Sequence, residues 1–294
     1  MGDVAWIAVD WGTSHLRAWL MRKDGAIVAR RQSGDGMSTL DRNGFEPALE
    51  ALVGDALPVP VLACGMVGSR QGWVEAPYSA VPCAPPGVHQ AVQVPGMDVH
   101  ILPGVKQARP ADVMRGEETQ IAGYLATHPG FDGVICLPGT HTKWVHVSAG
   151  EIVSFRTAMT GEMFALLSTQ SVLRHSVGTG WDADSFMTGV DQAMAKPEAL
   201  AAALFSLRAE GLLDGLDTDK ARARLSGLLI GAELAAMKPY WLGQQVALIG
   251  APTLSRAYAV ALDAQAAPNH TADVEEMTLA GLTAAWTQMH GEIA

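Results

Sequence analysis

A glycine followed by a threonine occurs twice at the end of an apolar run, once in each half of the chain. Glycine has no side chain to block the approach of an anion to backbone N–H groups, and a neighbouring hydroxyl adds a further donor. Turns of this kind bind phosphate oxygens, although either one alone is equally compatible with an ordinary β-hairpin. The candidate phosphate-binding residues are Gly12, Thr13 and Ser14 in the first turn and Gly139, Thr140 and His141 in the second.

Asp10 lies two residues before the first of these glycines, at the end of an apolar run. A carboxylate in this place can hold a hydrated Mg²⁺ against the phosphates of a nucleotide. Asp is also a common turn residue that hydrogen-bonds to its own backbone, so this second reading stays open.

The two turns belong to an internal repeat, residues 7–28 and 135–153. Each copy has an apolar strand, a Gly-Thr turn, a second strand, a Gly-containing turn and a third strand. We therefore expect two related α/β domains facing one another, residues 1–127 and 128–294, each supplying one phosphate turn.

Hydrophobic periodicity predicts the elements that position these turns. The expected strands are 4–9, 16–21, 26–31, 59–63, 98–102, 133–137, 142–148, 151–157 and 245–249. The expected helices are 117–127, 161–175, 181–194, 198–213, 218–239, 253–264 and 278–290. Residues 65–97 show no period, and a loop of that length in a compact protein is usually functional.

Composition narrows the partners and the compartment. The chain has 294 residues, a formal net charge of -10 and three cysteines. The negative charge argues against a nucleic-acid partner, and no apolar run is long enough to span a membrane. An odd number of cysteines without a CxxC pair favours a cytoplasmic protein. P-loop, Rossmann and zinc-protease motifs are absent from the sequence.

Six segments carry a resemblance to known proteins. DWGTSHLRAW (10–19), LPGTHTKWV (137–145) and LIGAPTLSRAYAVAL (248–262) resemble the two phosphate motifs and the adenosine motif of the sugar kinase/hexokinase/actin superfamily. ACGMVGSRQGWVEAPY (63–78), MRGEETQIAG (114–123) and TAMTGEMFALLSTQSVL (157–173) resemble the 2-dehydro-3-deoxygalactonokinase family. The resemblance runs from about residue 5 to 285.

The resemblance implies two ribonuclease-H-like (actin-like ATPase) domains with a nucleotide cleft between them. It implies ATP- and Mg²⁺-dependent phosphorylation of the 6-hydroxyl of 2-dehydro-3-deoxy-D-galactonate, a step of galactonate catabolism. In that reading Asp10 organises Mg²⁺, the two Gly-Thr turns contact phosphates, and Gly250 lets adenosine approach the backbone. A homodimer is a candidate assembly.

The same resemblance suggests the catalytic base. Related sugar kinases have an Asp at the start of the helix before the second phosphate strand, where it takes the proton of the attacking hydroxyl. Aligning ETQIA with that pattern places Glu118 there, with Glu117 as the second choice. First-turn glutamates also complement the helix dipole, and one of the pair is expected to do only that.

A sugar acid needs a partner for its carboxylate, and the candidates are Arg70 and Arg115, because arginine offers a bidentate fork. Trp73 and Tyr78 could stack on the polyol or anchor a long loop, and Glu162 could bind a hydroxyl or cap a helix. The expected substrate-binding residues are Ser69, Arg70, Gln71, Trp73, Tyr78, Arg115 and Glu162.

Two other functions stay open at this stage. The acceptor could be another sugar acid or a ketose, such as 2-dehydro-3-deoxygluconate. The chain could also be a non-catalytic, nucleotide-gated sugar sensor, which would not need a carboxylate pair at residues 117–118.

Overall fold

The computed structural model describes residues 4–290, which divide into two compact units. Of these residues, unit 1 contains 4–132, 147–155 and 272–290, and unit 2 contains 133–146 and 156–271. The step at residues 132–133 lies close to the predicted boundary at 127–128. The C-terminal segment, however, packs with unit 1, whereas the sequence analysis grouped it with the C-terminal domain.

Unit 1 is built on a six-stranded sheet of order β3-β2-β1-β4-β7-β6. Strand β1 pairs antiparallel with β2 and parallel with β4. Apart from Asp10, every residue of β1 is buried, as its apolar sequence predicts for a central strand. The strands are β1 (Trp6–Trp11), β2 (Leu16–Met21), β3 (Ile27–Ser33), β4 (Val61–Gly65), β6 (Val92–Gln93) and β7 (Val99–Ile101).

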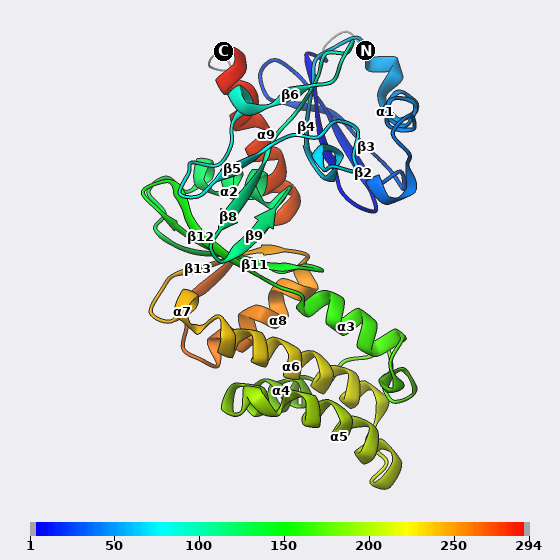
Figure 1. Cartoon of the computed structure of the whole chain (residues 1–294), viewed down its shortest axis with the longest axis vertical. Coiled ribbons are helices and arrows are strands. Elements are labelled where there is room, and N and C mark those ends of the chain that lie inside the picture. The colour runs from blue at the N-terminus through cyan, green and yellow to red at the C-terminus, as the bar shows by residue number, and fades with distance from the viewer. Residues whose placement is uncertain (1–3, 291–294) are drawn as a thin grey trace. The chain divides into compact units, whose positions relative to one another are not determined.

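Two helices, α1 (Phe45–Val53) and α9 (Val274–His290), pack on this sheet, and α9 also packs against helix α2 (Glu117–Thr127). Helix α1, which the sequence did not predict, packs into one hydrophobic core, and helix α9 packs into another through Leu282 and Trp286. Figure 1 shows α9 beside α2. This apolar packing is why the C-terminal helix belongs to unit 1.

The contact between α2 and α9 depends on two glycines. A Cβ added to Gly123 would lie 1.9 Å from the Met277 oxygen, and one added to Gly281 would lie 1.9 Å from the Thr119 oxygen. The two helices therefore touch backbone to backbone, and α9 fixes the position of α2.

Residues 65–97 are not one irregular loop, contrary to the sequence prediction. They contain β5 (Tyr78–Ala80) and β6, together with two short 3-10 helices. β5 joins β8 (Gly104–Ala108) and β9 (Ala111–Met114) in a small sheet of order β5-β8-β9. β5 and β6 have three and two residues, too few to show an alternation in the sequence.

Unit 2 is built on a five-stranded sheet of order β12-β11-β10-β13-β14. The order β12-β11-β10-β13 repeats β3-β2-β1-β4, and β10 runs parallel to β13 as β1 does to β4. The topology thus confirms the internal repeat. The strands are β10 (Gly133–Leu137), β11 (Thr142–Ser148), β12 (Glu151–Ala158), β13 (Val246–Gly250) and β14 (Asn269–Asp273), and residues 147–155 and 272–273 are counted with unit 1.

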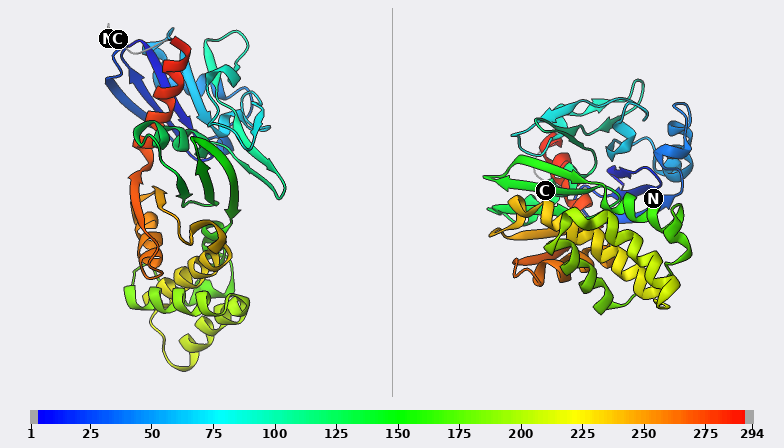
Figure 2. Two further views of the ribbon diagram at one scale, coloured as in Figure 1. Left: turned by 90° about the vertical axis from the view of Figure 1, so that its left-hand side faces the viewer. Right: turned by 60° about the horizontal axis from the view of Figure 1, so that its bottom comes forward.

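The helices of unit 2 lie together in Figure 2. Among them α4 and α6 pack closely, since a Cβ added to Gly227 of α6 would lie 2.0 Å from the Phe186 oxygen of α4. Two predicted helices are broken. The one at 161–175 splits after residue 169, and the one at 218–239 splits at Met237. The helices are α3 (Thr160–Thr169), α4 (Ala183–Ala195), α5 (Leu200–Leu213), α6 (Thr218–Ala236), α7 (Lys238–Trp241) and α8 (Pro252–Asp263). Among residues 4–290, no helix is both long and apolar enough to cross a membrane.

Candidate active site

The three carboxylates predicted for catalysis converge in unit 1. Asp10 lies near the end of β1, and Glu117 and Glu118 begin α2. Gly116, with φ of +104°, turns the chain into α2, and a Cβ added there would lie 3.5 Å from Gly65 Cα at the end of β4. Since β1 and β4 are parallel neighbours, the start of α2 lies at the carboxyl ends of these strands, near Asp10.

Glu118 is the most buried of the three, with 1% of its surface exposed. Its two carboxylate oxygens accept the Gly116 N–H at 2.8 and 2.7 Å. Burial, and then the charge of Glu117, raises the pKa of Glu118 to about 8, against the lowering effect of its hydrogen bonds and of Arg115. A carboxylate that ionises close to neutral pH suits a general base.

Glu117 is half-buried, and its carboxylate accepts the backbone N–H of Arg115 at 3.0 Å. Its charge helps to raise the pKa of Glu118 and of Asp10. Glu117 therefore caps the turn into α2 and tunes the two carboxylates near it.

Asp10 keeps 18% of its side-chain surface exposed. Burial raises its pKa, Arg17 lowers it, and Glu117 and Glu275 raise it further. The Arg17 guanidinium lies 3.4 Å from the Asp10 carboxylate, because the two residues are opposite one another in the β1-β2 pair. Arg17 was not among the residues predicted from the sequence, because its pairing with Asp10 depends on the register of β1 and β2.

The backbone of the first phosphate turn is held from behind by η1 (Met37–Thr39). The Gly12 carbonyl accepts the Met37 N–H at 3.0 Å, and the Thr13 carbonyl accepts the Ser38 N–H at 2.9 Å. In a planar trans peptide the next N–H points opposite to the carbonyl. The N–H groups of Thr13 and Ser14 therefore point away from η1, on an exposed turn.

The second turn is built in the same way. The Thr140 carbonyl accepts the Glu162 N–H at 2.9 Å, so the His141 N–H points away from α3. The Glu162 carboxylate also accepts a hydrogen bond from His141 Nε2 at 2.6 Å. Glu162, predicted to meet a substrate hydroxyl, is thus engaged with the phosphate turn. Lys143, which the sequence analysis missed, is 5% exposed, and its Nζ donates to the His141 carbonyl at 3.4 Å.

Each backing segment carries a glycine that permits this contact. A Cβ on Gly36 would lie 2.3 Å from the Ser14 carbonyl carbon, and one on Gly161 would lie 2.2 Å from the Gly139 oxygen. Neither glycine stood out in the sequence, because its partner is distant along the chain. In both exposed turns carbonyl groups are hydrogen-bonded to the backing segment, and the following N–H groups point outward. Outward N–H groups of this kind can donate to phosphate oxygens.

The residues also fit a hydrated magnesium ion bound together with phosphates. Among the residues that the structure describes, no group of three or more His, Cys, Asp or Glu side chains could hold a metal. Asp10 would therefore supply one carboxylate, and phosphates and water the remaining ligands, which is how Mg²⁺ is usually bound at nucleotides.

Gly250 ends β13 and packs against the second turn. A Cβ there would lie 2.9 Å from the Pro138 oxygen and 3.0 Å from Ser255 Oγ. Helix α8 begins at Pro252, immediately afterwards. The predicted adenosine residue and the second phosphate turn are therefore neighbours within unit 2.

The structure separates the two arginines proposed for the sugar carboxylate. Arg115 is 8% exposed, its Nη2 donates to the Ala76 carbonyl at 2.7 Å, and its guanidinium stacks 4.3 Å above the Tyr78 ring. Its Nε and Nη1 have no partner among the described residues. Arg70 has 81% of its side chain exposed and lies 3.7 Å from Glu75.

The other predicted loop residues divide into buried and exposed ones. Ser69 is 5% exposed, and within the described chain its hydroxyl has no hydrogen-bond partner, whereas Gln71 is exposed. Trp73 stacks on Phe45 at 6.1 Å and meets Trp11 edge-on at 6.0 Å. Trp73 is half-buried and packs against the hydrophobic core, as the loop-anchoring alternative predicts. Its role as a substrate contact stays a prediction.

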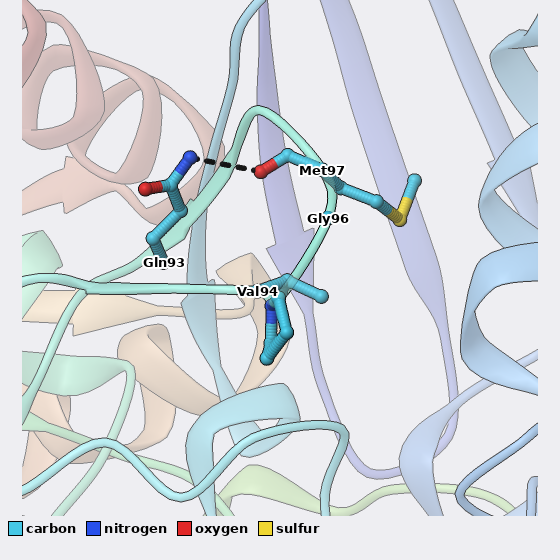
Figure 3. A pocket seen from close by; sticks show the side chains of 5 residues that line it. Gln93, Val94, Gly96 and Met97 are labelled. Atoms are coloured by element: carbon cyan, nitrogen blue, oxygen red, sulfur yellow. Dashed lines mark hydrogen bonds between the residues drawn. The ribbon is translucent and has the colours of Figure 1, made fainter.

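A surface hollow elsewhere in unit 1 does not coincide with these residues. Figure 3 shows it at residues 93–97, where Gln93 Nε2 donates to the Met97 carbonyl at 3.0 Å. None of the predicted site residues lines it, so it is not the candidate active site.

Comparison with known families supports the resemblance. A family model described as 2-keto-3-deoxy-galactonokinase, a synonym of 2-dehydro-3-deoxygalactonokinase, matches residues 10–285. The chain belongs to this kinase family. It is 40% identical over 294 residues to a Rhizobium meliloti protein named a probable 2-dehydro-3-deoxygalactonokinase, covering 95% of each chain. It is 37% identical to the 2-dehydro-3-deoxygalactonokinase of Escherichia coli, covering 88% of this chain and 89% of that one.

Comparison of this chain with solved structures shows its fold class. A crystal structure of a Sinorhizobium meliloti protein named for the same kinase superposes with a TM-score of 0.93 at 38% identity, covering 98% of this chain and 100% of that one. A component of (R)-2-hydroxyglutaryl-CoA dehydratase from Acidaminococcus fermentans, at 14% identity and a TM-score of 0.53, covering 96% and 97%, shares the fold alone. The predicted α/β fold of actin-like ATPases and sugar kinases is confirmed.

Proposed function

We propose that this protein transfers the γ-phosphoryl group of ATP to the 6-hydroxyl of 2-dehydro-3-deoxy-D-galactonate, in the galactonate catabolism of the cytoplasm. The proposal rests on membership of the kinase family. The structural observation that carries it is the convergence of Asp10, Glu117 and Glu118 where β1 ends and α2 begins.

Each Gly-Thr turn is proposed to bind phosphate oxygens of ATP through its outward N–H groups. Asp10 is proposed to hold Mg²⁺, which neutralises charge on the phosphates during transfer. The ion pair between Arg17 and Asp10 would then break. The Arg17 side chain is 38% exposed, so its guanidinium could contact the phosphates instead.

Glu118 is the proposed general base. It accepts the proton of the acceptor hydroxyl while that oxygen forms its bond to phosphorus, and ADP leaves. The Gly116 N–H holds the carboxylate in place, and burial keeps its pKa high enough to accept a proton. Glu117 is the proposed tuning charge, because it adds to that increase.

Arg115 is the proposed partner of the sugar carboxylate. A buried guanidinium with two unpaired nitrogens is costly, and an incoming carboxylate offers the charge-assisted bonds that it lacks. Arg115 also immediately precedes the turn into α2, so a bound acid would lie close to the proposed base. Ser69 and Tyr78 are proposed as further contacts, whereas the exposed Arg70 is not.

The test is ADP release by the purified protein with ATP, Mg²⁺ and a panel of acceptors. The panel contains 2-dehydro-3-deoxygalactonate, its gluconate epimer, a neutral ketose and the free sugars. We expect kcat/KM to be highest for 2-dehydro-3-deoxygalactonate, with phosphate on the terminal oxygen of the product. Equal or better turnover of the epimer or the ketose would reassign the substrate, and ADP release independent of every acceptor would refute the kinase proposal.

A further inference from the structure

Glu233 is a buried carboxylate that the proposed mechanism leaves unused. It lies on α6 in unit 2 with 5% of its surface exposed. Its Oε1 accepts the Trp144 indole N–H at 2.7 Å, and its Oε2 accepts the Tyr258 hydroxyl at 2.9 Å. The Thr160 side chain also hydrogen-bonds to it. A buried carboxylate with three donors costs far less than an unpaired one.

The three donors come from the elements that surround the proposed nucleotide contacts of unit 2. Trp144 lies on β11, two residues after the start of the strand that leaves the second phosphate turn. Thr160 begins α3, whose next residues, Gly161 and Glu162, support that turn. Tyr258 lies on α8, the helix that follows Gly250. One carboxylate therefore joins the turn, its support and the adenosine-side helix.

Glu233 also sets the direction of a further hydrogen bond. Because the Tyr258 hydroxyl donates to the carboxylate, its oxygen is left to accept the Thr142 hydroxyl, 3.0 Å away. Thr142 is the first residue of β11 and fully buried. Two side chains of β11 are thus tied, directly or through Tyr258, to the same carboxylate.

We propose that Glu233 is a positioning residue for the nucleotide: it holds the second phosphate turn and α8 in the arrangement that binds ATP, without touching ATP. The proposal rests on the proposed function, since it takes both elements to be nucleotide contacts. A turn and a helix that are already in place need no ordering when the ligand arrives, and this lowers the free-energy cost of binding.

The test compares Glu233→Gln with wild type. Glutamine keeps the size and one acceptor oxygen, which can still receive the Trp144 N–H. Its NH₂ group then faces the Tyr258 oxygen, so the Tyr258 hydroxyl can no longer donate to residue 233. Glu198→Gln is the matched control, because Glu198 is an exposed carboxylate of the same unit. Calorimetry with ADP gives nucleotide affinity without turnover, and steady-state kinetics give KM for each substrate.

We expect Glu233→Gln to weaken ADP binding and raise KM for ATP at least tenfold, while KM for the sugar acid changes less than twofold and Glu198→Gln matches wild type. Unchanged ADP affinity in a folded Glu233→Gln protein would overturn the positioning role, as would an equal increase in both KM values. If wild type itself binds no ADP and shows no turnover, the proposed function fails instead.

Tyr258→Phe keeps the inference testable if Glu233→Gln does not fold, because it removes only a hydroxyl. It deletes the bond to Glu233 and the bond to Thr142 together. We expect Tyr258→Phe alone to lose three- to tenfold in ADP affinity, and unchanged affinity would overturn the proposal. Where Glu233→Gln does fold, the variant with both substitutions should lose less binding free energy than the sum of the two single losses. Additive effects would show that the two side chains act separately, against the proposal.

Discussion

Replacing Glu118 with glutamine should make the protein more stable at alkaline pH while it lowers turnover. The folded-state pKa of Glu118 is raised to about 8 from an ordinary value of 4.5. A carboxyl group that binds its proton more tightly when folded contributes most stability below pH 4.5, and this contribution is lost as pH rises through 8. The neutral glutamine mimics the protonated form and keeps an acceptor for the Gly116 N–H.

The size of the effect follows from the two pKa values. Each unit of difference is worth about 1.4 kcal/mol, so the raised pKa of Glu118 lowers the free energy of unfolding by about 5 kcal/mol well above pH 8 and by about 3 kcal/mol at pH 7. Below about pH 5 the difference shrinks to less than about 1 kcal/mol. Glu118 is 1% exposed, so solvent screening does not reduce these values.

Urea unfolding followed by tryptophan fluorescence at pH 5, 6, 7 and 8 measures this difference. We expect the stability gain of Glu118→Gln over wild type to grow steadily with pH, and Glu198→Gln, at an exposed position, to show no such trend. A gain that does not depend on pH, or a variant less stable than wild type at pH 8, would refute the account of Glu118 as a buried carboxylate with a raised pKa.

The same carboxylate links stability to catalysis. If Glu118 is the base, kcat/KM rises with pH up to about 8, because only the ionised form accepts a proton. Glu117→Gln removes a charge that raises this pKa, so the rise should move to lower pH. A profile that stays in place in Glu117→Gln would show that Glu117 does not tune the base.

Three further predictions concern the supports of the site. Arg115→Lys should raise KM for the sugar acid about 10- to 100-fold in the acceptor assay, while Arg70→Ala changes it less than twofold; the reverse order would restore Arg70 as the carboxylate partner. Gly36→Ala should raise KM for ATP at least tenfold, because its Cβ would lie 2.3 Å from the first turn. Gly34→Ala, whose Cβ would meet nothing within 4 Å, should match wild type. Equal effects of the two substitutions would show that the clash at Gly36 does not affect ATP binding. Gly281→Ala should lower the free energy of unfolding, measured in urea, by about 1–3 kcal/mol, and it should reduce kcat because α2 is displaced. If the variant is folded and its kcat is unchanged, α9 does not support the base.

The sequence was sufficient for features that depend on neighbouring residues. The repeated order of strand, Gly-Thr turn and hairpin predicted two equivalent turns, and the structure repeats this strand order in the two sheets. Helix α2 and strands β10 and β11 have the predicted bounds. β10, for example, is a continuous apolar run, which is a local feature of the sequence. The start of α2 was therefore located with the two glutamates on it.

The features that were missed depend on contacts between distant residues. Gly36 and Gly161 support the phosphate turns from 22 or more positions away, so no local pattern distinguishes them from other glycines. Arg70 and Arg115 looked equivalent as sequence, and only burial separates them. The packing of Trp73 against the core could not be predicted until Phe45 and Trp11 were placed around it.

The most direct test of the central claim measures ADP release with 2-dehydro-3-deoxy-D-galactonate for wild type and Glu118→Gln side by side, with ADP affinity determined for both. The account predicts wild-type ADP release that depends on the sugar acid, and a Glu118→Gln protein that binds ADP like wild type but turns over at least about 100-fold more slowly. Near-normal kcat in Glu118→Gln would contradict the assignment of the base. Wild-type protein that releases no ADP with any sugar acid would contradict the proposed function itself.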